Sequence, residues 1–191
     1  MATQVRGAAR RAQLLAQLVD LLLAEGFAHL TLEEIAGRLR CSKSTLYSLA
    51  ASKEQLVRAA TVHFFRGATE RVERSVDGVV DARDRIRLYL EAVGEQLRPA
   101  SARFMADLAD NDVVREVYER NTAIAARRVQ DLITDGVRSG EFRDVHAAFV
   151  ADVTAATMVR IQRRQVREAT GLDDAQAYQE LASLVTNGLA M

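Results

Sequence analysis

Hydroxyl and basic side chains gather in residues 31–56, where three small hydroxyl residues stand at positions suited to the start of a helix. These are Thr31, Ser42 and Ser52, and the second opens the run SKSTLY, residues 42–47. Hydroxyl and lysine side chains hydrogen-bond to phosphate oxygens and base edges. The stretch therefore offers polar recognition, although helix capping alone also accounts for Ser42 and Ser52.

The rest of the sequence offers no recognisable catalytic or metal-binding pattern. The serines near residue 42 lack the G-x-S-x-G turn that exposes a nucleophile. The histidines lie far apart and form no H-E-x-x-H pattern. We therefore expect that the protein is not an enzyme and needs neither cofactor nor metal. The three histidines are His29, His63 and His146.

The single cysteine, Cys41, excludes an intramolecular disulfide. Its neighbours Arg40 and Lys43 would lower the pKa of the thiol if they lay close to it, which is typical of an oxidant sensor. The alternative is that Cys41 packs as a small hydrophobic residue.

Composition and spacing predict an all-α protein that is cytoplasmic and not in a membrane. The 191 residues are 49% hydrophobic with one proline, and they contain neither a run of about eighteen apolar residues nor a secretory signal. Helix periodicity and capping residues predict about nine helices. They are expected at residues 8–25, 31–39, 42–48, from 52 onward, and at 82–97, 102–109, 112–138, 145–168 and 174–189.

The two short helices at 31–39 and 42–48 favour a helix-turn-helix. Thr31 and Glu34 have the spacing of a capping box, which stabilises a helix too short to persist alone. In a helix-turn-helix the first helix crosses the DNA backbone and the second enters the major groove. Residues 42–48 would then be the reading helix.

The run from Gly26 to Leu56, GFAHLTLEEIAGRLRCSKSTLYSLAASKEQL, resembles the N-terminal DNA-binding domain of the TetR family of transcriptional regulators. The resemblance implies a helix-turn-helix domain in residues 1–56 and a larger helical domain for ligand binding and dimerisation in residues 57–191. It also implies which side chains approach bases and phosphates. These are Thr31, Ser42, Lys43, Ser44, Thr45, Tyr47 and Lys53.

This sequence departs from the family pattern at three positions. Arg40 stands at the turn, where the family usually has glycine and where a left-handed backbone would cost a residue with a Cβ about 1 kcal/mol. Ala50 replaces an aromatic residue, a loss of volume that Leu30 and Leu49 would have to refill. Ser44 replaces a common glycine and adds a possible contact.

The N-terminal segment is slightly basic. Residues 1–58 carry eight Lys or Arg and five Asp or Glu, within a chain of net charge zero. Arg6, Arg10 and Arg11 would follow the DNA backbone or enter a minor groove, or would remain a solvated arm.

Two C-terminal helices are expected to form a homodimer interface. The helix at 145–168 is apolar almost all round, which is typical of burial on more than one side, and the final helix adds further apolar residues that include Leu184. A central helix of a monomeric bundle is the alternative. The expected interface residues are Phe149, Val153, Ala156, Tyr178, Leu181 and Val185.

A small-molecule effector, apolar or amphipathic, is expected among the middle helices, as in the family. At helical spacing such pocket residues are also typical of a plain core. The candidate pocket residues are Phe64, Tyr89, Phe104, Met105, Tyr118 and Met158.

The sequence thus predicts a homodimeric repressor that binds a palindromic DNA operator and is released by a small molecule. The alternative is a helical dimeric ligand-sensing or scaffold protein whose head contacts a protein partner. Salt-sensitive binding to DNA separates the two.

Overall fold

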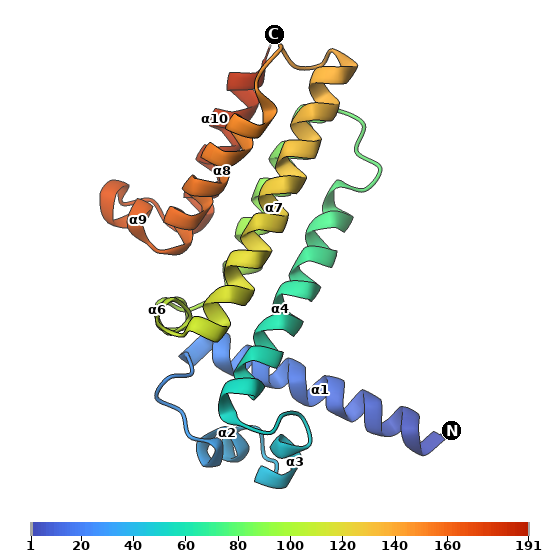
Figure 1. Cartoon of the computed structure of the whole chain (residues 1–191), viewed down its shortest axis with the longest axis vertical. Helices are drawn as coiled ribbons and strands as arrows, with labels where there is room; N and C mark the ends of the chain where they lie inside the picture. The colour runs from blue at the N-terminus through green and yellow to red at the C-terminus, as the bar shows by residue number, and fades with distance from the viewer. Residues whose placement is uncertain (1, 191) are drawn as a thin grey trace. The chain divides into compact units, whose positions relative to one another are not determined.

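The computed structural model describes residues 2–190 and the side chains from residue 9 onward, so Arg6 of the predicted arm lies outside the described side chains. Throughout this range the regular structure is helical, which confirms the all-α prediction (Figure 1). None of the helices within it has the length and apolarity needed to cross a membrane. The helices are α1 (Ala2–Glu25), α2 (Leu32–Arg38), α3 (Lys43–Tyr47), α4 (Lys53–Val76), α5 (Ala82–Leu97), α6 (Ala102–Asp110), α7 (Asp112–Ser139), α8 (Ala147–Gln162), α9 (Gln165–Thr170) and α10 (Asp174–Leu189).

The chain divides into two compact units. The first comprises the residues up to Gly67 together with Pro99–Tyr118, and the second comprises Ala68–Arg98 and the described residues from Glu119 onward. The boundary expected between residues 56 and 57 falls inside α4, and α6 joins the first unit although it lies far along the chain.

The first unit buries one or two apolar side chains from each of its short helices. Ile35 of α2 and Leu46 of α3 are fully buried, as are Leu18 and Leu22 of α1. Helices of two turns or fewer have few internal hydrogen bonds, so this burial and their capping stabilise them. Ser52 accepts a hydrogen bond from the Gln55 N–H at 3.2 Å and begins α4 as expected.

The turn between α2 and α3 is left-handed at Arg40, where the family usually has glycine, with φ of +50°. The Arg40 N–H donates to the Gly37 carbonyl at 3.1 Å, and the Cys41 N–H donates to the Ala36 carbonyl at 2.9 Å. These bonds satisfy the end of α2 and offset the cost of a Cβ in this conformation, about 1 kcal/mol.

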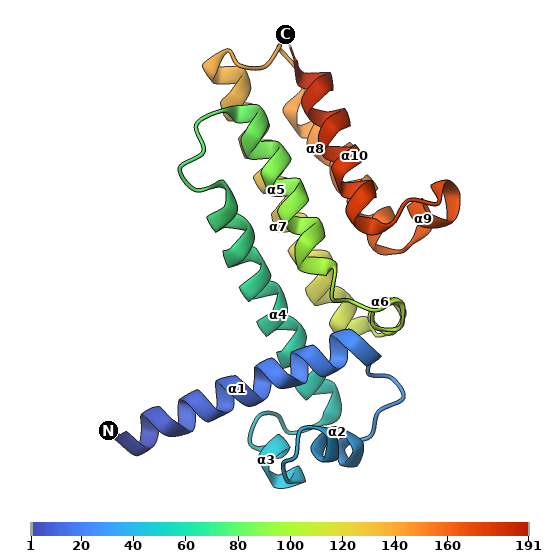
Figure 2. The same cartoon turned by 180° about the vertical axis from the view of Figure 1, so that it is seen from behind.

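The second unit packs α10 against α5 and α8, and Figure 2 shows α8 and α10 side by side from behind. A Cβ added to Gly94 of α5 would lie 3.0 Å from the Tyr178 ring of α10, so glycine permits this close approach. The Tyr178 hydroxyl accepts a hydrogen bond from the Gln162 amide at 2.9 Å.

The helix expected at residues 145–168 is interrupted, and this prediction was wrong. Within residues 2–190 the chain forms ten helices rather than about nine, because α8 ends at Gln162 and α9 begins at Gln165. Arg164, between them, has φ of +62° and forms an ion pair with Asp174 at 3.1 Å. Beyond Gln162 the sequence has no continuous apolar face, so burial does not favour one uninterrupted helix, and a turn at Arg164 separates α8 from α9.

Candidate nucleic-acid interface

The third helix, α3, buries one side chain in the core of the first unit and exposes most of the others. Leu46 has no exposed surface, whereas Tyr47 beside it is 52% exposed. Ser42, Lys43 and Ser44 are also exposed, and Thr45 is half-buried. The structure therefore gathers the predicted reading residues on one short, outward-facing helix.

The hydroxyls at the start of α3 form a small cluster. Ser42 Oγ accepts the Thr45 N–H at 3.1 Å and lies 2.8 Å from Thr45 Oγ1 and 2.7 Å from Ser44 Oγ. A hydroxyl has one donor and two acceptor positions, so these groups keep capacity for an external partner.

Thr31 begins α2 through a complete capping box. Its hydroxyl accepts the Glu34 N–H at 3.2 Å, and the Glu34 carboxylate accepts the Thr31 N–H at 2.7 Å. The hydrogen bonds from Thr31 to the carboxylate hold the pKa of Glu34 below its ordinary value of 4.5, with smaller contributions from His29 and Lys53. The predicted capping box is confirmed.

We expect Thr31→Ala to destabilise the fold by about 0.5–2 kcal/mol, because it removes the capping acceptor. The pKa of Glu34 should rise part of the way toward 4.5, because the hydroxyl donor is lost while the stronger N–H donor of residue 31 remains, and NMR titration would detect this change. A carboxylate whose pKa is lowered by folding stabilises the protein at pH values above its unfolded-state pKa, and this stabilisation is lost as the pH falls through its folded-state pKa. The difference in free energy of unfolding between wild type and Thr31→Ala should therefore shrink on acidification below pH 4.5. Thr170→Ala, on exposed α9, is the control. An unchanged Glu34 pKa would contradict this explanation.

Both lysines of the chain lie in this region, and each has an internal partner. Lys53 Nζ donates to the carbonyl of Ala28 at 3.0 Å. Lys43 forms an ion pair with Glu33 on the exposed surface. Each amine therefore has a partner within the first unit.

Of the predicted basic arm, Arg10 and Arg11 are exposed on α1. Arg11 donates to the Leu49 carbonyl at 3.3 Å, just after α3, a contact that the sequence did not suggest. Ala50 and Leu49 are half-buried and Leu30 is fully buried.

The structure favours the packing interpretation of Cys41. The side chain is half-buried, and burial raises the pKa of its thiol, with Arg10 opposing the shift. The pKa is therefore not lowered by Arg40 and Lys43, as an oxidant sensor would require.

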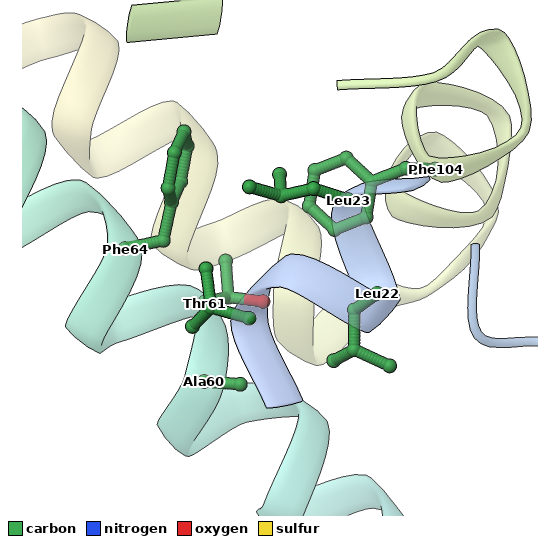
Figure 3. A pocket seen from close by; sticks show the side chains of 7 residues that line it. Leu22, Leu23, Ala60, Thr61, Phe64 and Phe104 are labelled. Carbon is green, nitrogen blue, oxygen red and sulfur yellow. The ribbon is translucent and has the colours of Figure 1, made fainter. Parts of the chain in front are cut away.

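Four of the predicted pocket residues belong to the first unit. Phe64 and Phe104 line a small void of about 10 Å³ between α1, α4 and α6, and Figure 3 shows Phe64 and Phe104 around it with Thr61. Such a void has room for no more than one water molecule. Tyr118 packs on Phe65 with ring centroids 5.8 Å apart, and Met105 is half-buried.

The other two predicted pocket residues, Tyr89 and Met158, are buried in the second unit. Burial raises the pKa of Tyr89, and Glu73 adds to the effect while Arg128 opposes it. Glu73 and Arg128 form an ion pair at 3.1 Å. The six residues are thus divided between two cores, and their role in ligand binding stays a prediction.

Phe104→Ala should destabilise the protein by about 3–5 kcal/mol. Phe104 is buried and meets the Phe27 ring edge-on, with centroids 6.0 Å apart. Urea denaturation measures the loss, and Val80→Ala, at a side chain 87% exposed, serves as the control. A loss below about 1 kcal/mol would show that Phe104 is not a core residue.

The predicted interface residues separate into two sets. Phe149, Val153 and Ala156 of α8 are exposed, whereas the residues predicted on α10 are buried within the second unit and leave little surface for a partner. Leu184 of α10 is instead 72% exposed. The buried α10 residues are Tyr178, Leu181 and Val185.

Comparison with known proteins agrees with this geometry. Residues 14–60 match the model of a family described as bacterial regulatory proteins, tetR family. A comparison with curated proteins finds no match.

Solved structures of transcriptional regulators resemble the whole chain. One from Saccharomonospora viridis, in complex with choline, has a TM-score of 0.79 and 18% identity over 96% of this chain and 99% of that chain. A TetR-family regulator from Rhodococcus sp. has a TM-score of 0.75 and 18% identity over 95% and 98%. The ketosteroid regulator KstR2 of Mycobacterium tuberculosis has a TM-score of 0.62 and 21% identity over 95% of each chain.

At these identities the likeness establishes the fold alone, and the family match covers residues 14–60. The resemblance predicted from Gly26–Leu56 is confirmed. Residues 14–60 match the family of bacterial regulatory proteins, tetR family, and the fold of the chain is similar to the folds of solved transcriptional regulators.

Proposed function

We propose that the protein is a repressor that binds a palindromic DNA operator as a homodimer and leaves it when a small molecule binds. The exposed face of α3 is the observation that carries this proposal. Buried Leu46 anchors the helix while Ser42, Lys43, Ser44 and Tyr47 remain exposed. These side-chain types suit contacts to phosphates and base edges.

An apolar surface supports the homodimer. Phe149 and Val153 of α8 are 66% and 47% exposed, Ala156 is exposed, and Leu184 is exposed on the neighbouring helix α10. We call these four residues the α8–α10 patch. Large apolar side chains that a fold leaves in water favour association with a matching surface. In a two-fold dimer this patch would meet its own copy.

Two reading helices are needed for useful specificity. One short helix contacts few bases, whereas a two-fold dimer reads two half-sites about 34 Å apart on one face of the duplex. The operator would therefore be palindromic, with half-sites related as the two subunits are.

The effector is proposed to bind in the second unit, where Tyr89 and Met158 lie. One solved relative in fold holds choline and another is named for ketosteroids, so the fold accommodates chemically different ligands. The buried Tyr89, whose raised pKa keeps its hydroxyl protonated, offers an aromatic ring and a hydroxyl that suit an amphipathic compound. Such a ligand would favour dimers whose reading helices no longer match the operator.

Selection of bound sequences from random duplex DNA tests the proposal. We expect a palindromic consensus whose binding weakens steeply with added salt, and compounds that dissociate the complex should then be found by screening. Recovery of no consensus, together with salt-independent binding, would favour a head that contacts a protein partner. Ile124→Ala, in an exposed part of the second unit, is the control for variants in the reading helix.

A further inference from the structure

A carboxylate on α6 holds the loop between α1 and α2. Asp107 Oδ2 accepts the N–H of Phe27 at 2.5 Å and the N–H of Ala28 at 2.8 Å, although 80 and 79 residues separate the partners. A single oxygen thus binds two successive backbone donors. Gly26, just before them, has φ of +77°, and a Cβ there would lie 2.5 Å from the same oxygen.

Two further contacts fasten α6 to this region of the first unit. The Ser101 N–H donates to the Leu23 carbonyl at 2.8 Å, at the end of α1. The Phe104 ring packs edge-on against Phe27 at 6.0 Å. The loop is therefore anchored on α6 by polar and apolar contacts together.

The same loop also contacts Lys53, a lysine predicted to approach DNA. The carbonyl of Ala28 accepts a hydrogen bond from Lys53 Nζ at 3.0 Å, and Thr31 three residues later begins α2. The N–H groups of Phe27 and Ala28 belong to the two peptide units that precede the Ala28 carbonyl, so Asp107 holds the backbone up to Ala28 and positions that carbonyl, the acceptor for the lysine amine, through residue 28 itself.

We propose that Asp107 is a positioning residue for DNA binding, because it fixes the Ala28 carbonyl that holds the Lys53 amine at the DNA backbone. The proposal rests on the proposed function for its consequence at the operator, but its structural step stands alone. A lysine held in place loses less side-chain freedom when it meets a phosphate. Asp107 does this without touching DNA itself.

The salt dependence of operator binding tests the consequence. Each lost phosphate contact lowers the slope of log affinity against log salt by about 0.9. We expect Asp107→Ala to lower this slope by as much as Lys53→Ala does. The double variant Asp107→Ala/Lys53→Ala should have the same slope as Lys53→Ala alone. Asp107→Asn, which keeps an acceptor oxygen, should retain most of the slope. Asp110→Ala removes the same charge from the same helix and should leave it unchanged.

Lysine reactivity tests the structural step without DNA. Because Lys43 and Lys53 are the only lysines in the sequence, acetylation by a small acylating reagent gives Lys53 reactivity relative to an internal reference. The ratio should rise severalfold in Asp107→Ala and stay constant in Asp110→Ala. In the wild type, the exposed Ala28 amide should be protected from hydrogen exchange, which gives a readout that does not depend on any variant folding.

The outcomes distinguish the two proposals. A wild-type slope in folded Asp107→Ala, additive loss with Lys53→Ala, an unchanged acetylation ratio, or an unprotected Ala28 amide would each overturn the role of Asp107. Failure of the wild type to select any DNA would overturn the proposed function, while the acetylation ratio and Ala28 exchange would still decide whether Asp107 positions Lys53.

Discussion

Aspartate at both Phe149 and Leu184 is expected to convert the protein into a monomer with little affinity for its operator. Both side chains are exposed and belong to the α8–α10 patch. Burying an unpaired carboxylate at an interface costs roughly 3–5 kcal/mol, and the two-fold dimer would bury four. Binding to a single half-site should approach the non-specific level, a loss of about 10³-fold or more.

Sedimentation and operator titration measure the two effects of this double substitution. Val80→Asp adds a charge at a side chain that is 87% exposed between α4 and α5, and it should leave both association and binding unchanged. A double variant that still sediments as a dimer would show that the patch is not the interface.

Tyr47→Ala is expected to weaken operator binding about hundredfold while leaving stability almost unchanged. A hydrogen bond to a charged phosphate contributes about 1.5 kcal/mol, or about tenfold in affinity, and a dimer has two copies. The ring is 52% exposed, so its removal leaves no cavity in the core. Tyr47→Phe should reproduce most of the loss if the hydroxyl makes the contact.

Fluorescence anisotropy with labelled operator measures this affinity, and thermal melting checks the fold. Leu46→Ala, at the neighbouring buried position, is the informative contrast because it should reduce stability by about 2–5 kcal/mol. Unchanged binding by a folded Tyr47→Ala protein would remove Tyr47 from the interface.

The sequence predicted the helices well where capping residues and apolar periodicity agree. Thr31, Ser42 and Ser52 begin helices as expected, and the range expected at 82–97 is that of α5. The sequence left the path of the turn at Arg40 open, and the structure shows that this arginine adopts the left-handed conformation for which glycine is usually preferred.

Features that depend on contacts distant in sequence were not predicted. The break at Arg164 is accompanied by an ion pair with Asp174 across α9, and the loop contact of Asp107 joins segments 80 residues apart. No local pattern indicates either partner. The composition of the first unit, which takes α6 from the middle of the chain, depends on such contacts as well.

The buried face of α10 could have been inferred from its spacing. Tyr178, Leu181 and Val185 recur at three and four residues, which is the period of one helix face, and that face is buried. Leu184 falls outside this period and is exposed. An apolar residue outside the buried face of the helix, here Leu184, is therefore a better indication of a surface that contacts a partner than the residues on that face.

The spacing of operator half-sites tests the central claim most directly. If two α3 helices read one face of the duplex, inserting about five base pairs between the half-sites turns one of them to the opposite face. Anisotropy titration should then show an affinity near the non-specific level. An insertion of about ten base pairs returns both half-sites to one face of the duplex but moves them farther apart, so the affinity should recover only in part. Equal affinity for the original operator and the one with five added base pairs would contradict the account.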